Sequence, residues 1–359
     1  MRCSRRATRG SCSTASLRKP DSGFSPAALA AVLSGELRLP PSVRLVLALS
    51  GGLDSMVLLY ELAVLRTVFP LSLRAVHIDH ALHPDSAAWG RACAQVCAQL
   101  AVPFDVRPVT VSTVAADGLE AAARRARYAA LTELLEPGEI LVTAHQRDDQ
   151  AETVLLQLLR GTGVAGLAGM PARAAFGHGE LVRPLLGIAR ATLEAYGRSN
   201  GLTWIDDPSN ADLRLRRNYL RTEIMPRLRA VWPETDRMLV RAAGHAAEAV
   251  ELLDERADGD LAGCRARDAS VHVREALSVA QLTTLSPARQ RNVLRRWLRQ
   301  QGFPVPGAQQ LEVLLAQLRH TPRSQHACVC WPGAEVWRYR DQLVVLAPQA
   351  MPDAALTVI

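Results

Sequence analysis

The chain has 359 residues, 48% of them hydrophobic and 21% charged, which is the composition of a globular protein long enough for two domains. Its net charge of +7 does not indicate a basic body, because residues 1–20 carry six of those seven charges and no acidic residue. No uncharged run reaches the ~18 residues that a membrane-spanning helix needs. Composition therefore argues against a membrane protein, and only local charge clusters could indicate a nucleic-acid partner.

The first half of the chain alternates between short apolar runs and helical patterns. The expected strands span residues 44–49, 73–79, 103–109 and 140–145, and the expected helices span 54–65, 86–100, 119–135 and 149–160. The strand starts recur every 29 to 37 residues, which is the period of βαβ units. The sequence therefore predicts an α/β fold, a doubly wound parallel sheet with helices on both faces and ligands at the carboxyl ends of its strands.

A Gly-rich loop, Ser50-Gly51-Gly52-Leu53-Asp54-Ser55, follows the first expected strand and opens a helix. Backbone N–H groups at a helix N-terminus bind phosphate, and the two glycines allow the backbone to approach it closely. Asp54 would repel phosphate directly, so we expect it to bind Mg²⁺ that bridges the phosphates. The alternative is a tight strand–helix turn capped by Ser50 and Asp54. The loop lacks the lysine of a Walker motif.

A second Gly-rich stretch, residues 161–166, matches G-x-G-x-x-G but follows a helical pattern rather than a strand. A dinucleotide fingerprint needs a strand before it and a helix after it, so we expect a loop or a helix C-cap here.

Titratable residues follow the fourth expected strand, beside the strand of the Gly-rich loop. Asp149 with Glu152 three residues later has the pattern of a helix capping box, which is the structural alternative. That alternative leaves His145 and Asp148 without a role, so we favour a functional site.

The second half of the chain continues in helical patterns after about residue 220, which predicts a second, smaller, mainly helical domain. The stretch 286–301 has an apolar stripe formed by Val293, Leu294, Trp297 and Leu298. Two local clusters of arginine lie in this half, and we expect them to bind RNA phosphates, although a solvated helix face explains each equally well. They contain Arg214, Arg216, Arg217, Arg221, Arg227 and Arg229, and then Arg291, Arg295 and Arg299.

Seven cysteines without a C-x-x-C pair make a disulfide framework or a zinc site unlikely, and a cytoplasmic location fits them. Cys93 and Cys97 lie four apart on a helical pattern and are expected in the core. We expect the thiols of Cys328 and Cys330 to point to opposite faces of a strand.

Several motifs resemble one family. The loop at 50–55 resembles the PP-loop of ATP pyrophosphatases, which release pyrophosphate and leave AMP on a substrate oxygen. The stretch LVTAHQRDDQAETVLLQLLRGTGVAGLAGM at 141–170 resembles the signature of tRNA(Ile)-lysidine synthetases. The similarity extends to EAAARRARYAAL at 120–131, RPLLGIARATLEAYGRSNGLTWIDDPSN at 183–210 and RRNYLR at 216–221. A weaker resemblance over 285–346 is to the family's small helical substrate-binding domain.

This resemblance implies a reaction on the wobble cytidine in the CAU anticodon of tRNA(Ile). ATP would adenylate the C2 oxygen of the base, pyrophosphate would leave, and the ε-amine of free L-lysine would displace AMP to give lysidine. The base must leave its stack to react, which an anticodon loop allows. A tRNA thiolase, an ammonia-using synthetase and an inactive tRNA-binding module are the alternatives. The absence of paired cysteines and of a glutaminase portion disfavours the first two, and the intact loop with Asp149 disfavours the third.

The resemblance also implies roles for individual residues. Asp54, His145 and Asp149 would be catalytic, Glu152 would hold the lysine ammonium, and Arg124 with Arg127 would contact phosphate or the lysine carboxylate. ATP would bind the loop from Ser50 to Ser55, including Gly51, Gly52 and Leu53, together with Mg²⁺ at Asp54. The arginines expected to contact tRNA are Arg214, Arg216, Arg217, Arg221, Arg291, Arg295 and Arg299.

The expected organisation has four parts. Residues 1–22 form a disordered basic extension, 23–224 the PP-loop ATP-binding catalytic domain, 225–346 the helical tRNA-binding domain and 347–359 a tail. A further carboxyl-terminal domain of some members is expected to be absent. The expected partners are tRNA(Ile), lysine and, as an open option, a second copy of the chain in a homodimer.

Overall fold

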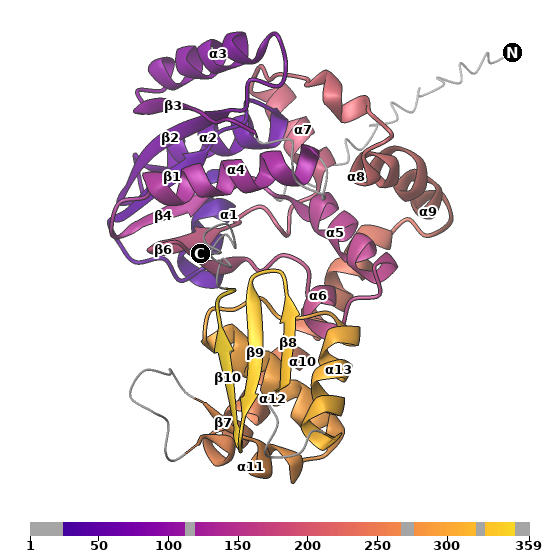
Figure 1. The fold of residues 1–359 in the computed structure, drawn as a ribbon. Helices are drawn as coiled ribbons and strands as arrows, with labels where there is room; N and C mark the ends of the chain where they lie inside the picture. The colour runs from indigo at the N-terminus through magenta and orange to yellow at the C-terminus, as the bar shows by residue number, and fades with distance from the viewer. Residues whose placement is uncertain (1–23, 112–118, 267–275, 321–326, 349–359) are drawn as a thin grey trace, which may run out of the picture. The chain divides into compact units, whose positions relative to one another are not determined.

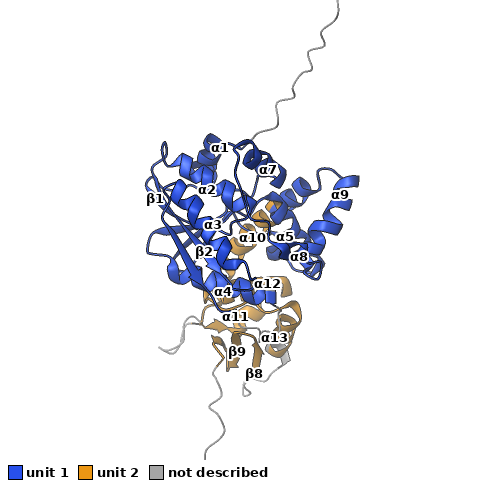
Figure 2. Ribbon diagram, turned by 90° about the horizontal axis from the view of Figure 1, so that it is seen from above, with its two compact units in different colours: residues 1–243 blue, residues 244–359 orange. Residues whose placement is uncertain are grey.

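The chain divides into two compact units, residues 1–243 and 244–359 (Figures 1 and 2). The computed structural model describes residues 24–111, 119–266, 276–320 and 327–348, so the expected extension 1–22 and nearly all of the expected tail lie outside the described residues. The division falls within helix α10 (Thr235–Cys264), later in the chain than the boundary expected at residue 225. None of the described helices combines the length and apolar character needed to cross a membrane.

The first unit is built on a six-stranded sheet with the order β3-β2-β1-β4-β6-β5. All neighbouring strands are parallel except β5 and β6, which form an antiparallel hairpin at one edge. The parallel sheet is confirmed, and the hairpin is an addition that the sequence did not predict. The strands are β1 (Val43–Ala48), β2 (Leu71–Asp79), β3 (Phe104–Pro108), β4 (Glu139–Val142), β5 (Arg173–Phe176) and β6 (Gly179–Val182).

Both faces of this sheet are covered by helices, because alternate residues of each strand point to opposite sides. Leu45 and Leu47 of β1 pack in one core with α1 (Pro26–Ala31), α2 (Leu53–Leu65), α3 (Ser86–Gln99) and α7 (Arg190–Ser199). Val46 points the other way and packs in a second core with α4 (Leu119–Leu134). The buried Cys93 and Cys97 of α3 belong to the first core, as expected. The doubly wound architecture is confirmed.

The order of strands creates a switch point between β1 and β4. From β1 the chain builds outward through β2 and β3, and it then crosses to the opposite side of β1 to form β4. In such sheets ligands bind where the strand order reverses, outside the carboxyl ends of the strands. Ser50 follows β1 and His145 follows β4, so both expected motifs lie at this point.

The rest of the first unit is helical and lies around the carboxyl edge of the sheet (Figure 1). The helix α5 (Arg147–Leu159) ends before Gly161, whose φ of +66° is typical of a helix C-cap. A four-residue helix follows. This confirms that the 161–166 stretch is no dinucleotide fingerprint. The helices are α5 (Arg147–Leu159), α6 (Val164–Leu167), the 3₁₀-helix η2 (Pro208–Ala211), α8 (Arg216–Tyr219), the π-helix η3 (Leu220–Ile224) and α9 (Met225–Val231); a π-helix η1 (Val32–Glu36) follows α1.

The second unit combines helices with an antiparallel sheet of order β7-β10-β9-β8, which was not predicted. Its strands are short, and the Pro332-Gly333 turn between β8 and β9 was the available sequence signal. Val293 and Trp297 of α12 are at most 1% exposed, which confirms the apolar stripe. The elements are α10, β7 (Leu277–Ser278), α11 (Val279–Thr283), α12 (Pro287–Gln300), α13 (Ala308–His320), β8 (Ala327–Trp331), β9 (Ala334–Tyr339) and β10 (Gln342–Leu346).

The orientation expected for two cysteines was wrong. Cys328 and Cys330 lie on β8 with their Sγ atoms 3.2 Å apart, because residues two apart on a strand share one face. Both are free thiols, as are the other three cysteines of the described segments.

Candidate functional site

The Gly-rich loop is held in a fixed shape at the start of α2. Gly51 has a φ of +84°, a conformation that favours glycine, and its carbonyl accepts a hydrogen bond from the N–H of Ile205 at 2.9 Å. The hydroxyl of Ser55 donates to the carbonyl of Gly52 at 2.9 Å and lies 3.0 Å from the Ser50 hydroxyl. The first N–H groups of α2 have no partner within the helix, so this loop presents backbone donors to an anion.

Asp54 stands in the first turn of α2 with only one of its carboxylate oxygens occupied. Oδ2 accepts a hydrogen bond from Nη1 of Arg190 at 3.1 Å, whereas Oδ1 is buried and has no hydrogen-bond partner within the structure. Burial raises the pKa of Asp54 to about 6, although Arg190 opposes this shift. A buried, unpartnered carboxylate oxygen is the donor that a hard cation such as Mg²⁺ prefers.

His145 lies three residues after the end of β4 and contacts a neighbouring hydroxyl. Its Nδ1 is 2.9 Å from the hydroxyl of Thr143. Burial lowers the pKa of His145 to about 3, and the partial opposing effect of Asp149 is smaller. The imidazole is therefore neutral at physiological pH, which suits a hydrogen-bonding group better than a proton acceptor.

The start of α5 forms a capping box, but with other residues than the structural alternative named. The N-cap is the fully buried Gln146, whose side chain accepts from the N–H of Asp148, and Asp149 is the third helical residue. Asp149 Oδ2 accepts from the N–H of Gln146 at 3.1 Å, which completes the box. The structural alternative, a capping box of Asp149 and Glu152, is therefore wrong, because the helix begins at Arg147.

An ion-pair cluster connects α5 with α8 and η3. Glu152 is 1% exposed, and its two oxygens accept from Nε of Arg217 at 2.9 Å and from Nε of Arg221 at 2.7 Å. Arg221 also donates to Oδ1 of Asp149 at 2.8 Å. Four predicted site residues are therefore brought together. Arg217 and Arg221 are committed to carboxylates in this structure and do not form an open basic patch.

A second chain of ion pairs reaches the loop and was missed from the sequence. Arg190, at the start of α7, binds Asp54 through its side chain and Asp148 through its N–H, at 3.0 Å from Oδ2. The other oxygen of Asp148 accepts from Arg229 at 3.0 Å, and Arg229 also pairs with Asp236 at 2.7 Å. The only available signal for Arg190 was its place in the family-like stretch 183–210.

Three further guanidinium groups gather near Tyr128. Arg124 and Arg127 of α4 lie 4.9 and 5.7 Å from the Tyr128 ring centroid, and Arg183 donates to the carbonyl of Pro171 at 2.7 Å. Burial lowers the pKa of Arg127 and of Arg183, and the positive charges of Arg183, Arg217 and Arg124 help to hold His145 neutral. No carboxylate pairs with Arg124, Arg127 or Arg183 among the described residues. The group can therefore accept an anion.

The remaining predicted arginines are divided by their partners. Arg214 is exposed and pairs with Asp212 at 2.8 Å, whereas Arg216 has no ion pair or side-chain hydrogen bond in the described part of the chain. In the second unit, Arg291 pairs with Glu312 at 3.1 Å. On the same helix, Arg299 binds Asp254 of α10, while burial lowers the pKa of Arg295. The acidic stretch of α10 thus neutralises part of the expected basic face.

Comparisons with known proteins give matches over both halves of the chain. The chain matches the PP-loop domain over residues 29–228 and the TilS substrate binding domain over residues 277–344. It is 48% identical over 305 residues to the tRNA(Ile)-lysidine synthase of Alkalilimnicola ehrlichii, covering 85% of this chain and 67% of that protein. It is 45% identical over 297 residues to the same-named protein of Coxiella burnetii, covering 83% and 65%. The chain thus spans about two thirds of the length of these relatives.

Among solved structures, a U34-tRNA thiolase of Methanococcus maripaludis is similar with a TM-score of 0.54 and 18% identity. The match covers 62% of this chain and 78% of the thiolase, and it shows a shared fold.

Proposed function

This chain belongs to the tRNA(Ile)-lysidine synthase family, and from that premise we propose that it joins lysine to C2 of the wobble cytidine of a CAU-anticodon tRNA(Ile). In the first step the C2 oxygen of the base attacks the α-phosphate of ATP, and pyrophosphate leaves. In the second step the lysine ε-nitrogen bonds to C2, the C2–O bond breaks, and AMP leaves with its oxygen while the nitrogen loses a proton. The observation that carries the proposal is the convergence of the Gly-rich loop, Asp54, His145 and Asp149 at one switch point.

The loop from Ser50 to Ser55 binds the phosphates of ATP through the backbone donors at the start of α2. Asp54 holds Mg²⁺ through its unpartnered Oδ1, while Arg190 fixes the other oxygen. When bound, Mg²⁺ supplies positive charge that stabilises the phosphates during transfer. Arg190 keeps Asp54 oriented, so we assign it a positioning role.

His145 orients the reacting base or nucleotide as a neutral hydrogen-bonding group. Its lowered pKa makes it a poor proton acceptor, so we assign it no role as a general base. Thr143 restricts the ring by its contact with Nδ1. Asp149 lies at the amino end of α5, within the same carboxyl edge of the sheet.

The free lysine has two charged ends, and two clusters match them. Arg124, Arg127 and Arg183 supply positive charge for its carboxylate. Asp149 and Glu152 supply negative charge for an ammonium group. Both oxygens of Glu152 are bound to arginine here, so ammonium binding by Glu152 requires Arg217 or Arg221 to move away.

The fold is shared with a tRNA thiolase, but the chemistry of the thiols disfavours thiolation. The Sγ atom of Cys93 would lie 3.1 Å from a Cβ built on Gly51, so this thiol is close to the loop. Burial raises the pKa of Cys93 to about 11, which keeps it protonated and poorly nucleophilic. A reducing, cytoplasmic setting is part of the proposal, because the seven cysteines contain no C-x-x-C pair.

The test is incorporation of labelled lysine into unmodified tRNA(Ile) in the presence of ATP and Mg²⁺. We expect label in the RNA and release of AMP and pyrophosphate in equal amounts. Asp54→Asn should reduce incorporation at least 100-fold, because the amide keeps the hydrogen bond to Arg190 but loses the charge. Asp105→Asn is the matched control, since Asp105 is a partly exposed residue of β3 that pairs with Arg107. Unlabelled RNA with active ATP turnover would contradict the proposal, and near-normal activity of Asp54→Asn would contradict the role of Asp54.

A further inference from the structure

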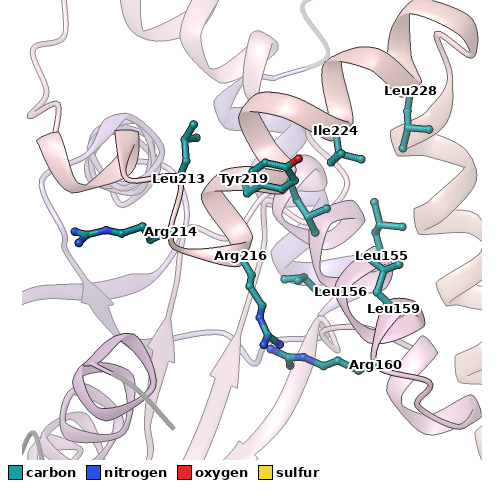
Figure 3. Close-up of a pocket in the computed structure, with 11 residues that line it drawn as sticks. Leu155, Leu156, Leu159, Arg160, Leu213, Arg214, Arg216, Tyr219, Ile224 and Leu228 are labelled. Atoms are coloured by element: carbon teal, nitrogen blue, oxygen red, sulfur yellow. The ribbon is translucent and has the colours of Figure 1, made fainter.

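The first unit contains a cavity of about 640 Å³ that none of the proposed catalytic roles uses. One wall is the carboxyl-terminal half of α5, and the other is formed by the segment from Leu213 to Leu228 (Figure 3). Its size falls within the range of ligand-binding pockets. Its lining is aliphatic apart from one tyrosine and three arginines, and it consists of Leu155, Leu156, Leu159, Arg160, Leu213, Arg214, Arg216, Tyr219, Leu220, Ile224 and Leu228.

Apolar side chains in this cavity remain open to solvent. Leu159 is 69% exposed and Tyr219 is 47% exposed, although both are large. A cluster of exposed apolar side chains bordered by charged residues is typical of an interaction site. The π-helix η3 follows Tyr219 directly, and π-turns inside helices are frequent at functional sites.

Two of the three arginines that line the cavity have no carboxylate partner among the described residues. The side chains of Arg160 and Arg216 extend toward one another (Figure 3). Neither has an ion pair or a side-chain hydrogen bond within the described part of the chain. Two guanidinium groups at one cavity without a carboxylate partner leave their N–H donors available to an anion. Arginine binds phosphate through paired hydrogen bonds.

The cavity is also close to the catalytic cluster. Leu155 and Leu156 follow Glu152 by one turn of α5, and Asp149 precedes Leu156 by about 10 Å along the helix axis. On the opposite wall, Arg217 and Arg221 face Glu152, while Arg216 and Tyr219 line the cavity. The same two elements therefore form the catalytic cluster and the cavity.

We propose that this cavity binds an unstacked base of the anticodon loop next to the target cytidine, with Arg160 and Arg216 on its phosphate. The inference rests on the proposed function and adds a second base-binding site to it. Unpaired bases bind by stacking on aromatic rings and in apolar pockets, and their phosphates bind arginine. Tyr219 stacks on the base and the leucines of α5 enclose it.

The experiment measures binding of a fluorescent anticodon stem-loop RNA, in a series where each loop base other than the target cytidine is replaced in turn by an abasic site. The target cytidine is kept throughout the series. We expect one abasic position to weaken binding to the wild-type chain about 5- to 100-fold. Tyr219→Ala should cause a similar loss and should make binding insensitive to that same abasic position. Tyr219→Phe keeps the ring and should bind like the wild type.

Leu159→Ser should also weaken RNA binding, with Val68→Ser as the matched control. Val68 is also a highly exposed aliphatic residue, 79% exposed, between α2 and the amino end of β2. Additive losses in Tyr219→Ala and the abasic RNA would overturn the inference. Unchanged RNA binding in Leu159→Ser would also overturn the inference. This holds as well if light scattering shows that the variant dissociates a dimer. If the wild type incorporates lysine, such results overturn only this inference; if it binds no RNA, the proposed function fails as well.

Discussion

Gly51 and Gly52 are neighbours in the loop but have different structural demands. Gly51 has a φ of +84°, and a Cβ there would lie 2.6 Å from Cδ1 of Ile205. Gly52 has a φ of −74°, which any residue adopts, and a Cβ there would meet its nearest neighbour, the Ser50 hydroxyl, at 3.6 Å. The first glycine is required by the fold of the loop, whereas the second leaves room for an approaching phosphate.

We therefore expect the two alanine variants to separate stability from ATP use. Gly51→Ala should destabilise the chain by about 1–3 kcal/mol, because it combines a left-handed backbone with a steric clash. Gly52→Ala should leave the free energy of unfolding within about 0.5 kcal/mol of the wild type. It should weaken ATP binding, because its methyl group lies where the phosphates come close to the backbone. Urea unfolding and ATP binding measure the two effects, and equal stability losses would contradict this distinction.

Glu61 is a buried acid that the catalytic proposal does not use. It lies on α2 with no exposed surface, and neither carboxylate oxygen has a hydrogen-bond partner among the residues that the structure describes. Burial raises the pKa of Glu61 from 4.5 to about 7. A raised pKa means that the folded state binds the proton more tightly than the unfolded state. The contribution of Glu61 to the free energy of unfolding is therefore fully present below pH 4.5, and it is lost as the pH rises through 7.

Glu61→Gln should remove this pH dependence while keeping the shape of the side chain. The wild type should lose up to about 3 kcal/mol relative to the variant between pH 5 and pH 8.5, at ~1.4 kcal/mol per pKa unit. The measurement is the free energy of unfolding of both proteins at several pH values, so that only the difference in slope matters. Parallel curves would show that Glu61 does not titrate in this range.

Most strands and helices of the sheet in the first unit could be predicted from the sequence, because the local sequence patterns match the structure that the fold requires there. Apolar runs of strand length, each followed by a helical pattern, predicted β1 to β4 and the helices after them to within a few residues. The antiparallel sheet of the second unit was not predicted. Its strands are short, so the turns between them were the main sequence signal for a sheet. The ion pairs at the site were missed for another reason. Charged residues as far apart in sequence as Asp54 and Arg190 meet only through the fold.

The contrast between Arg216 and Arg217 shows what the sequence could not resolve. Both belong to one basic run, but Arg217 turns toward α5 and binds the buried Glu152, whereas Arg216 lines the cavity. Sequence spacing alone assigned both to RNA phosphates. Their different partners predict different effects of substitution.

Arg217→Ala should destabilise the chain by about 1–3 kcal/mol, because Glu152 stays buried with one of its two partners removed. Arg216→Ala should change stability by less than about 0.5 kcal/mol. It should instead lower RNA affinity and flatten the dependence of log K on log salt by about 0.7, the value for one phosphate contact of a single strand. Unfolding and RNA binding at several salt concentrations test both variants. An unchanged salt slope in Arg216→Ala would show that this residue contacts no phosphate.

Charge is distributed very unevenly over the whole molecule. Six of the seven net positive charges belong to residues 1–20, and the remainder of the chain is close to neutral. In the described part, most arginines of α12 pair with acids of α10, and those of α8 and η3 pair with α5 in part. RNA binding by the folded units therefore depends on a few unpaired arginines rather than on a general positive field.

Removal of residues 1–20 should leave lysine incorporation and RNA affinity nearly unchanged, although it lowers the net charge from +7 to +1. The cut keeps Phe24, which is buried and packs edge-on against Tyr196 with ring centroids 5.2 Å apart, so folding should be unaffected. If the basic segment contacts phosphates, the truncated chain will instead show a salt slope smaller by about 0.7 to 0.9 for each lost contact. RNA binding from low to moderate salt, with Arg216→Ala as the reference for a single contact, decides between these outcomes. A fall in affinity that disappears at high salt would assign RNA binding to the segment as well as to the folded units.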